Sequence, residues 1–433
     1  MKNFSGQSVL TTSSLWTSTP RICAGVSPWS LITLLPCLLG ACSVINLEDH
    51  RDTNTQKVQQ AVNQVRADLE ASLQHQVPSL NVLIQTPTEK IFASSVPPGN
   101  APVTETTYFR FASNTKNFTS TAILNMYEDD WLDFRAPITG LIPGTTVPYV
   151  PDTPNWNFPY KNSITIEQLL QHSAGVFDVD NDPVPGFGGL SFTESTQTAD
   201  PTHQFSTDEM VDQLIRHNLS YFAPGTGYHY SNTGYSILAK IIERVYSVKS
   251  GSTKTYGDYL KDYVIGSTAP VPVTIHFPVR ADDTVLPSPH MAGLVLSPGS
   301  ARQYGDYNMS AQVGEGNGYG TMAALNTYIR SLMKGQNVLK PETVQIMQTD
   351  VSSANPTYAL GTTFTKNVGY GHNGARIGNL ALIAYDPLTD VSVVVYLPLW
   401  DLTQGDTSFL KCFTALYDAA YAARTTLGYP GRP

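Results

Sequence analysis

Apolar residues recur every third or fourth position near both ends of the chain, and this spacing is typical of an amphipathic helix. It predicts one helix over about 55–74 and another over about 407–424. Short apolar runs at 79–84 and 91–93, with a turn between them, predict two paired strands. The chain is therefore expected to begin with a helix and a hairpin and to end with a helix.

Two further apolar runs, at 380–384 and 391–396, flank the polar segment 386–390 and predict a second hairpin. The middle of the chain has helical spacing instead. Strands at both ends and helices between them predict an α/β (α+β) fold. We expect an antiparallel sheet built from the N- and C-terminal strands, with an all-helical subdomain inserted at about 130–300.

Helix starts in the middle of the chain are marked by capping boxes, in which a Ser or Thr is followed three residues later by Glu or Gln. Thr165 and Ser206 begin such boxes, and Tyr235 and Leu238 mark the face of a third helix. Residues 177–205 are rich in Asp, Pro, Gly and Thr and show no periodicity. We expect a long loop there, and loops of that length are usually functional or disordered.

The composition excludes one class of partner. With 433 residues, 41% of them hydrophobic, the chain can bury a sizeable core, and its 14% of charged residues argues against a disordered, solvated chain. There are 26 Lys and Arg against 35 Asp and Glu, for a formal net charge of −9. An acidic chain lacks the basic surface that binds phosphate backbones, so we expect no nucleic acid partner.

The N-terminal segment predicts export. Residues 1–41 contain no Asp or Glu, and the apolar run at 29–39 is followed by small residues and Cys42. This pattern predicts a signal peptide over 1–41. Residues 39–42 also resemble a bacterial lipobox, which implies a lipidated Cys42 and a tether over 42–55. An ordinary signal peptide with a chance Cys is the alternative.

The lipobox implies an anchor on the periplasmic side of the cell envelope, and Ser43 after the lipidated residue favours the outer membrane. Cys412 would then be the only Cys left besides Cys42, so we expect no disulfide framework and no zinc site built on Cys. Cys412 lies in a helical pattern, where a buried, inert thiol is expected. The nine His form no recognisable ligand set, so we expect no metal and no cofactor.

Ser113 and Lys116 form a Ser-x-x-Lys motif at the start of a predicted helix, where they would share one face. A serine hydroxyl needs a base to become a nucleophile, and a lysine buried beside a helix N-terminus is disfavoured as a cation. Backbone N–H groups at the helix start could help to hold an oxyanion. The same spacing begins at Ser331 and Ser408, but those residues lie within predicted helices.

Two later segments could complete the site. Tyr230 and Asn232 precede a predicted helix, where Tyr230 could relay a proton and Asn232 could hold the lysine and a substrate amide; a Gly-Pro turn followed by a helix cap is the alternative. His372, Asn373 and Gly374 lie just before the strand at 380–384. Gly374 would let a ligand approach an edge strand, or the segment is a turn with a surface His.

Taken in this order, the three segments resemble the signature of the penicillin-recognising serine hydrolases: Ser-x-x-Lys, then Ser/Tyr-x-Asn, then Lys/His-x-Gly. That family includes D-alanyl-D-alanine carboxypeptidases, class C β-lactamases, and related esterases and D-aminopeptidases. The resemblance extends from about 57 to 424. It implies a hydrolase domain over 56–424 with a tail at 425–433, and a catalytic cleft between the sheet and the helical subdomain.

The resemblance also implies roles for the residues. Ser113 would be acylated, Lys116 would be the general base and Tyr230 would shuttle the proton. Asn232 would orient the lysine and the substrate, and the backbone N–H groups of Ser113 and Ala375 would form the oxyanion hole. The substrate-binding set implied by the resemblance is Asn232, His372, Asn373, Gly374 and Ala375.

The third segment departs from the family pattern. His372 stands where class C β-lactamases have Lys, and Asn373 replaces the hydroxyl residue that helps the family to bind a substrate carboxylate. Arg376 could supply that charge or could be merely solvated. We expect an acyl-enzyme serine hydrolase that acts as a D-Ala-D-Ala carboxypeptidase on peptidoglycan-derived peptides. The alternatives are a β-lactamase or small-ester hydrolase, and an inactive lipoprotein that binds the cell wall.

Overall fold

The computed structural model describes residues 53–433. The predicted signal peptide, the lipidation site Cys42 and the tether up to residue 52 lie outside the described residues. Within residues 53–433, no helix is both long enough and apolar enough to cross a lipid bilayer.

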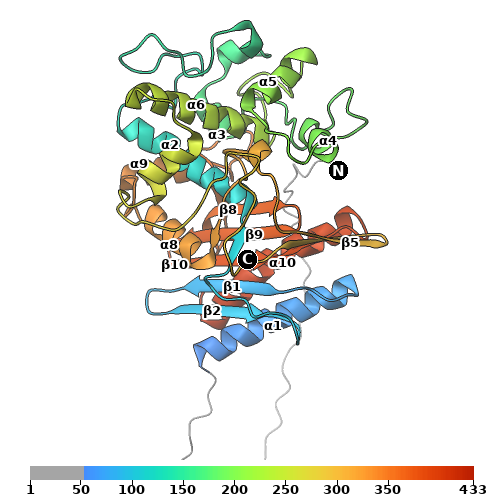
Figure 1. The fold of residues 1–433 in the computed structure, drawn as a ribbon. Helices are drawn as coiled ribbons and strands as arrows, with labels where there is room; N and C mark the ends of the chain where they lie inside the picture. The colour runs from blue at the N-terminus through green and yellow to red at the C-terminus, as the bar shows by residue number, and fades with distance from the viewer. Residues whose placement is uncertain (1–52) are drawn as a thin grey trace, which may run out of the picture. The chain divides into compact units, whose positions relative to one another are not determined.

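The described residues contain a six-stranded antiparallel sheet with the order β2-β1-β10-β9-β8-β7. Both predicted hairpins are confirmed, and β10 from the C-terminal hairpin pairs with β1 from the N-terminal one, with Val395 opposite Val82. The sheet therefore joins strands from the beginning and the end of the described residues 53–433 (Figure 1). Its strands are β1 (Leu80–Gln85), β2 (Lys90–Ser95), β7 (Thr363–Thr365), β8 (Gly369–Arg376), β9 (Asn379–Asp386) and β10 (Val391–Leu397).

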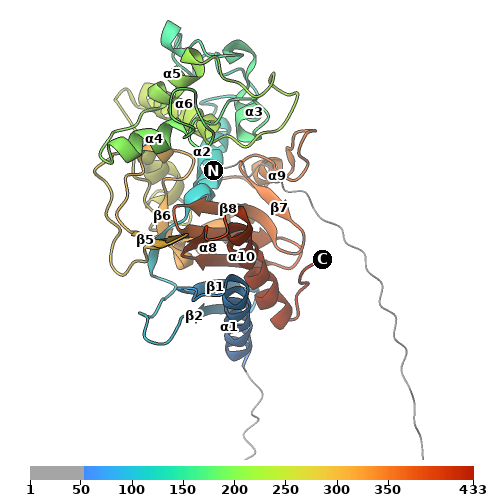
Figure 2. The same ribbon diagram turned by 90° about the vertical axis from the view of Figure 1, so that its right-hand side faces the viewer.

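Helices α1 (Asn54–Leu73) and α10 (Asp406–Thr426) lie side by side against one face of this sheet (Figures 1 and 2). Both were predicted from their apolar spacing. Cys412 of α10 is fully buried in this layer, and burial raises the pKa of its thiol to about 12. The expected burial of this thiol is therefore confirmed, and its raised pKa disfavours the reactive thiolate near neutral pH.

The other face of the sheet carries the larger core and the helical region (Figure 1). Alternate residues of one strand enter the two cores: in β9, Leu382 faces α1 and α10, whereas Ile383 faces the helical side. The helices on that side are α2 (Thr115–Glu128), α3 (Ile166–Leu170), α4 (Phe192–Ala199), α5 (Thr207–Arg216), α6 (Asn232–Ser250), α7 (Tyr256–Tyr259), α8 (Met322–Met333) and α9 (Pro341–Thr349).

Two expectations about the middle of the chain need correction. The segment 177–205 is not a loop throughout, because α4 begins after Ser191, whose Oγ accepts a hydrogen bond from Glu194 N at 3.1 Å. The range 130–300 is not all helical, because β4 (Gly293–Ser297) and β5 (Ser300–Tyr304) form a hairpin that pairs with β11 (Leu399–Asp401). Alternation of apolar and polar residues over so few positions is a weak signal for a strand. These strands are stabilised instead by the pairing of β4 with β11, which is distant in the sequence.

Candidate active site

Ser113 lies in a single helical turn, η1 (Ala112–Asn114), between β3 (Tyr108–Arg110) and α2. β3 is held by β6 (Tyr319–Thr321). Ala112, just before Ser113, has a φ of 49°, a left-handed conformation that costs an L-residue with a Cβ about 1–2 kcal/mol. Packing therefore holds a strained turn here. The turn leaves the side chain of Ser113 partly exposed, while its neighbours on both sides are buried.

Lys116 is fully buried one turn further along, as the Ser-x-x-Lys spacing predicts. Its Nζ lies 3.2 Å from Ser113 Oγ and donates to Asn232 Oδ1 at 2.7 Å. It also donates to the backbone oxygen of Glu315 at 2.8 Å. Burial lowers the pKa of Lys116 from its ordinary value of 10.5, although Glu315 partly opposes this effect. The amine is thus aimed at Ser113 with a reduced affinity for its proton, which suits a general base.

Glu315 is a site residue that the sequence analysis missed. Its Oε2 lies 3.2 Å from Lys116 Nζ, and the side chain is almost completely buried in the loop before β6. Burial raises the pKa of Glu315 to about 8, although Lys116 opposes the shift. Both members of the pair are therefore pushed towards their neutral forms. The available signal was an acid between Gly314 and Gly316 in a chain with few charges.

The phenol of Tyr230 is hydrogen-bonded to the side chain of Ser113, and its ring centroid lies 4.8 Å from Lys116 Nζ. Burial raises the pKa of Tyr230 well above 10. At neutral pH the residue is a phenol that can pass a proton on, and it is no competitor of Lys116 as a base. The cap alternative also holds locally, since Ser231 Oγ accepts a hydrogen bond from Gly234 N at 3.1 Å at the start of α6.

Asn232 connects the lysine to the segment that begins at residue 177. Its Nδ2 donates to Asp180 Oδ2 at 2.9 Å, and its backbone N–H donates to Asp178 Oδ2 at 3.0 Å. Burial raises the pKa of Asp178 to about 7, and the nearby Asp180 adds to this effect. The oxygen and the nitrogen of the Asn232 side-chain amide are thus both hydrogen-bonded within the protein, and the bond to Asp180 fixes the orientation of the oxygen that holds Lys116.

The segment 372–375 lies within β8, and its side chains alternate between the two faces of the sheet. Gly374 packs on the turn of the nucleophile, since a Cβ there would lie 2.2 Å from Phe111 O and 3.1 Å from Ser113 N. His372 lies on the same face, with its ring 6.4 Å from that of Tyr230. Asn373 instead points away, and its amide donates to Tyr417 Oη of α10 at 3.0 Å. The side chain of Ala375 packs on that far side too, which leaves only its backbone on the side of Ser113.

The structure thus brings Ser113, Lys116, Tyr230, Asn232, His372 and Gly374 together and turns the Asn373 side chain away from them. The two other Ser-x-x-Lys pairs lie elsewhere: Lys334 is paired with Asp390, and Lys411 donates to Ser72 O at 2.8 Å. No group of three or more His, Cys, Asp or Glu side chains within residues 53–433 is placed to hold a metal ion.

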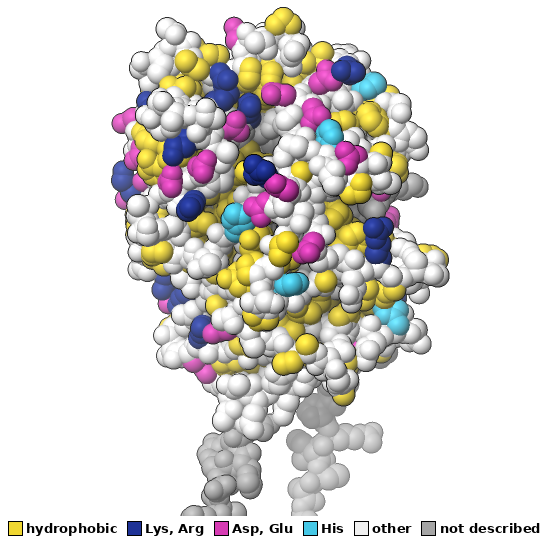
Figure 3. Space-filling model, viewed as in Figure 1, with side chains coloured by type: hydrophobic (Ala, Val, Ile, Leu, Met, Phe, Trp, Pro, Cys, Tyr) yellow, Lys and Arg dark blue, Asp and Glu magenta, His cyan; other side chains and the backbone are white. Residues whose placement is uncertain are grey.

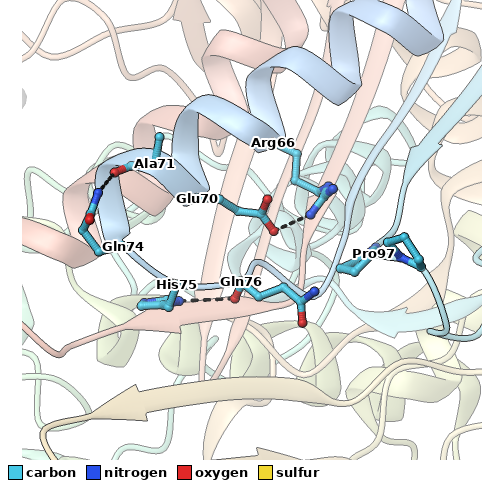
Figure 4. Close-up of a pocket in the computed structure, with 8 residues that line it drawn as sticks. Arg66, Glu70, Ala71, Gln74, His75, Gln76 and Pro97 are labelled. Atoms are coloured by element: carbon cyan, nitrogen blue, oxygen red, sulfur yellow. Dashed lines mark hydrogen bonds and ion pairs between the residues drawn. The ribbon is translucent and has the colours of Figure 1, made fainter.

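Two surface features lie apart from this chemistry. A hollow of about 560 Å³ adjoins the end of α1, where Arg66 pairs with Glu70 (Figure 4). It contains none of the site residues. On the face seen in Figure 3, charged side chains of both signs are scattered among apolar and uncharged polar ones, so this face has no large patch of a single charge.

Two buried histidines are expected to lower the stability of the fold on mild acidification, whereas Glu315 and Asp178, whose pKa values are raised, act in the opposite direction. Burial and the nearby Lys116 lower the pKa of His372 to about 3, and the same two causes lower the pKa of His172. Unfolded histidines titrate near 6.5, so between pH 6.5 and 3 the unfolded chain binds more protons. The contribution to stability is complete above pH 6.5 and is lost as the pH falls. Urea unfolding at pH 7 and pH 5 measures the net change in the free energy of unfolding.

Between pH 7 and pH 5, we expect the free energy of unfolding of His372→Gln to fall by about 1–2 kcal/mol less than that of the wild type. Gln retains an acceptor for the neighbouring hydroxyl but does not titrate. Acids with raised pKa values are present in both proteins, so the difference isolates the histidine. Exposed His290→Gln is the control and should behave like the wild type. Equal losses in His372→Gln and the wild type would contradict a neutral His372.

Comparison with known proteins places these features in a family. The Beta-lactamase family model matches residues 54–407. A segment of 162 residues, 37% of this chain, is 30% identical to penicillin-binding protein 4* of Bacillus subtilis, and it spans only 29% of that protein. Less than a third of that relative's length is therefore matched.

Several solved structures share this fold. Their sequence identities to this chain are low, so the likeness shows the fold alone. D-amino acid amidase of Ochrobactrum anthropi, complexed with L-phenylalanine amide, has a TM-score of 0.66 and 17% identity, over 86% of this chain and 99% of that one. D-stereospecific amidohydrolase from Streptomyces has a TM-score of 0.62 and 21% identity, over 82% and 97%. An octameric penicillin-binding protein homologue from Pyrococcus abyssi has a TM-score of 0.62 and 19% identity, over 85% and 77%. Because the family model matches most of this chain, the chain belongs to the β-lactamase family, the serine hydrolases of the β-lactamase and penicillin-binding-protein type.

Proposed function

We propose that this protein hydrolyses amide or ester bonds through an acyl-enzyme formed on Ser113. One observation carries the proposal: the amine of Lys116 lies 3.2 Å from Ser113 Oγ in a buried position that lowers its pKa. A nucleophile with a base in contact is the arrangement that covalent catalysis requires. An inactive wall-binding protein would have no use for it.

In acylation, Ser113 Oγ attacks the substrate carbonyl carbon while its proton passes to Lys116 Nζ. The backbone N–H groups of Ser113 and Ala375 are proposed to hold the oxyanion. The C–N or C–O bond then breaks, and the leaving amine or alcohol receives the proton through the phenol of Tyr230. Asn232 keeps the amine in line throughout.

In deacylation, a water molecule attacks the ester carbon of the acyl-enzyme and gives up a proton to the same base. The C–O bond to Ser113 breaks, the serine oxygen recovers a proton, and the acyl group leaves as a carboxylic acid. The buried carboxyl of Glu315 can take up or return a proton beside Lys116, so the lysine need not hold an unpaired charge in the interior.

The sequence favours D-Ala-D-Ala peptides of the cell wall as substrates, with β-lactams and small esters as alternatives. The family membership and the amidase-like fold are compatible with each of them. Lipid anchoring through Cys42 on the periplasmic side of the envelope, in the outer membrane, is part of the same proposal and rests on the lipobox resemblance. The choice among substrates depends on whether the cleft can bind a carboxylate.

Intact-mass spectrometry tests the covalent step. After exposure to a fluorophosphonate, we expect the mass of one adduct per chain, and after exposure to a β-lactam the mass of an acyl adduct. Proteolysis should locate both on the peptide that contains Ser113. An adduct on any other residue, or none with either reagent, would remove the support for the proposed function.

A further inference from the structure

A chain of hydrogen bonds fixes the protonation of two histidines beside the nucleophile. His172 Nδ1 accepts from the backbone N–H of Ser231 at 3.1 Å, so in the neutral ring Nε2 carries the proton. That nitrogen lies 3.1 Å from Tyr358 Oη and donates to it. Seen from the other end, His372 Nδ1 faces its neighbour's backbone oxygen, Asn373 O, and must donate there.

His372 Nε2 is then the bare nitrogen, and it accepts from the Tyr358 hydroxyl at 3.0 Å. The contacts of His172 and those of His372 independently require the same direction of donation: His172 donates to the Tyr358 hydroxyl, which donates to His372. A further proton on His372 would turn this acceptor into a donor facing a hydroxyl whose proton is already directed at it. Burial and Lys116 oppose that charge as well, which lowers the pKa of His372 to about 3. His372 is therefore a neutral part of the cleft wall.

Arg376, the other basic residue of β8, is already paired with a carboxylate. Arg376 Nη1 donates to Asp180 Oδ2 at 2.9 Å, and both side chains are largely buried. Burial alone would raise the pKa of Asp180, but Arg376 and hydrogen bonds from Thr193, Asn232 and Gln312 hold it below its ordinary value. The carboxylate is thus saturated and charged, and it holds Arg376 in place. A substrate carboxylate would have to displace Asp180 to reach the guanidinium.

Lys116, His172, His372 and Arg376 are basic side chains that the structure places near Ser113 and β8. Both histidines are neutral, as argued above. Lys116 is engaged behind the nucleophile, His372 is neutral, and Arg376 is paired. Asn373, which stands at the position where the family uses a hydroxyl to bind a carboxylate, points to the other face of the sheet. Among these described side chains, none offers an incoming carboxylate an uncompensated cation, and burying an unpaired charge is costly.

We propose that the cleft selects substrates whose leaving group carries no carboxylate, namely neutral amides and esters, over peptides that end in a free D-alanine. This inference rests on the proposed function, because it concerns the same acyl transfer at Ser113. It assigns the alternative of a small amide or ester hydrolase and disfavours the carboxypeptidase. Every bond made and broken is the same as in the general mechanism, and only the charge of the departing group differs.

A matched pair of peptides tests the inference. N-acetyl-D-alanyl-D-alanine ends in a carboxylate, and its C-terminal methylamide differs chiefly in that charge. We expect kcat/KM for cleavage between the two alanines, followed by mass spectrometry of released acetyl-D-alanine, to be at least tenfold higher for the methylamide. Aryl acetates give a second pair: 4-acetoxybenzoate and its methyl ester, with each rate divided by the rate of hydroxide hydrolysis. Equal or faster cleavage of the carboxylate members would overturn the inference.

A variant separates charge from shape. His372→Lys adds a cation beside the nucleophile and is expected to raise the carboxylate-to-methylamide ratio at least tenfold. Phe364→Lys, on the exposed part of β7, adds the same charge elsewhere and should leave the ratio unchanged. Fluorophosphonate labelling reports separately on Ser113. If the wild type were not labelled, that result would count against the proposed function. If His372→Lys does not fold, the wild-type ratios alone decide.

Discussion

Replacing Ser113 by alanine is expected to reduce labelling by a fluorophosphonate or a β-lactam to background, a fall of at least about 10³-fold. The partly exposed hydroxyl is the proposed nucleophile and is in contact with both Lys116 and Tyr230. In-gel fluorescence after a fixed exposure to a fluorescent fluorophosphonate measures the effect. Circular dichroism should show an unchanged fold, because only one partly exposed hydroxyl is removed.

The chain offers a matched control for this experiment. Ser331 also begins a Ser-x-x-Lys sequence, but its Oγ donates to Thr327 O at 2.8 Å within α8. Ser331→Ala should therefore label like the wild type. If Ser113→Ala continued to label while Ser331→Ala did not, the nucleophile would have been misassigned.

Replacing Lys116 by methionine is expected to lower the rate of acylation about 10²- to 10⁴-fold, the usual contribution of a general base. Methionine fills similar space but cannot accept a proton. Glu315→Gln is expected to retain the rate within tenfold, because Asn232 still holds the amine and the removed carboxylate favours its charged form. The second-order rate constant for fluorophosphonate labelling at pH 7 gives both values.

This comparison decides which buried group is the base. A fall in Glu315→Gln as large as that in Lys116→Met would assign the base to the carboxyl group. Lys334→Met is the matched control, since Lys334 occupies the same position relative to Ser331 and is paired with Asp390. Its labelling should not change.

Local patterns sufficed for most of the elements. The apolar spacing predicted α1 and α10 to within a few residues, and both capping boxes begin helices. Such signals are readable because capping and amphipathicity depend on residues a few positions apart. The hairpin of β4 and β5 was missed, since its strands are short and β4 pairs with β11, which lies over 100 residues further along the chain.

The same division runs through the site. Ser113, Lys116 and Tyr230 were identified from the order of three short motifs and the family that they resemble. Glu315 was not, because nothing in its immediate sequence states that the loop before β6 packs against the N-terminus of α2. The direction of the Asn373 side chain was equally hidden, as it depends on which face of β8 is turned towards α10.

Residue type and short spacing were enough to predict most of the helices and strands and to nominate a candidate nucleophile and base. The charge states of these groups became apparent only from the folded chain. Lys116, His372 and Asp180 lie far apart in the chain, and their pKa values depend on burial and on partners brought from other elements. Since a cleft recognises charge, the class of substrate could be inferred only after the chain had been seen folded.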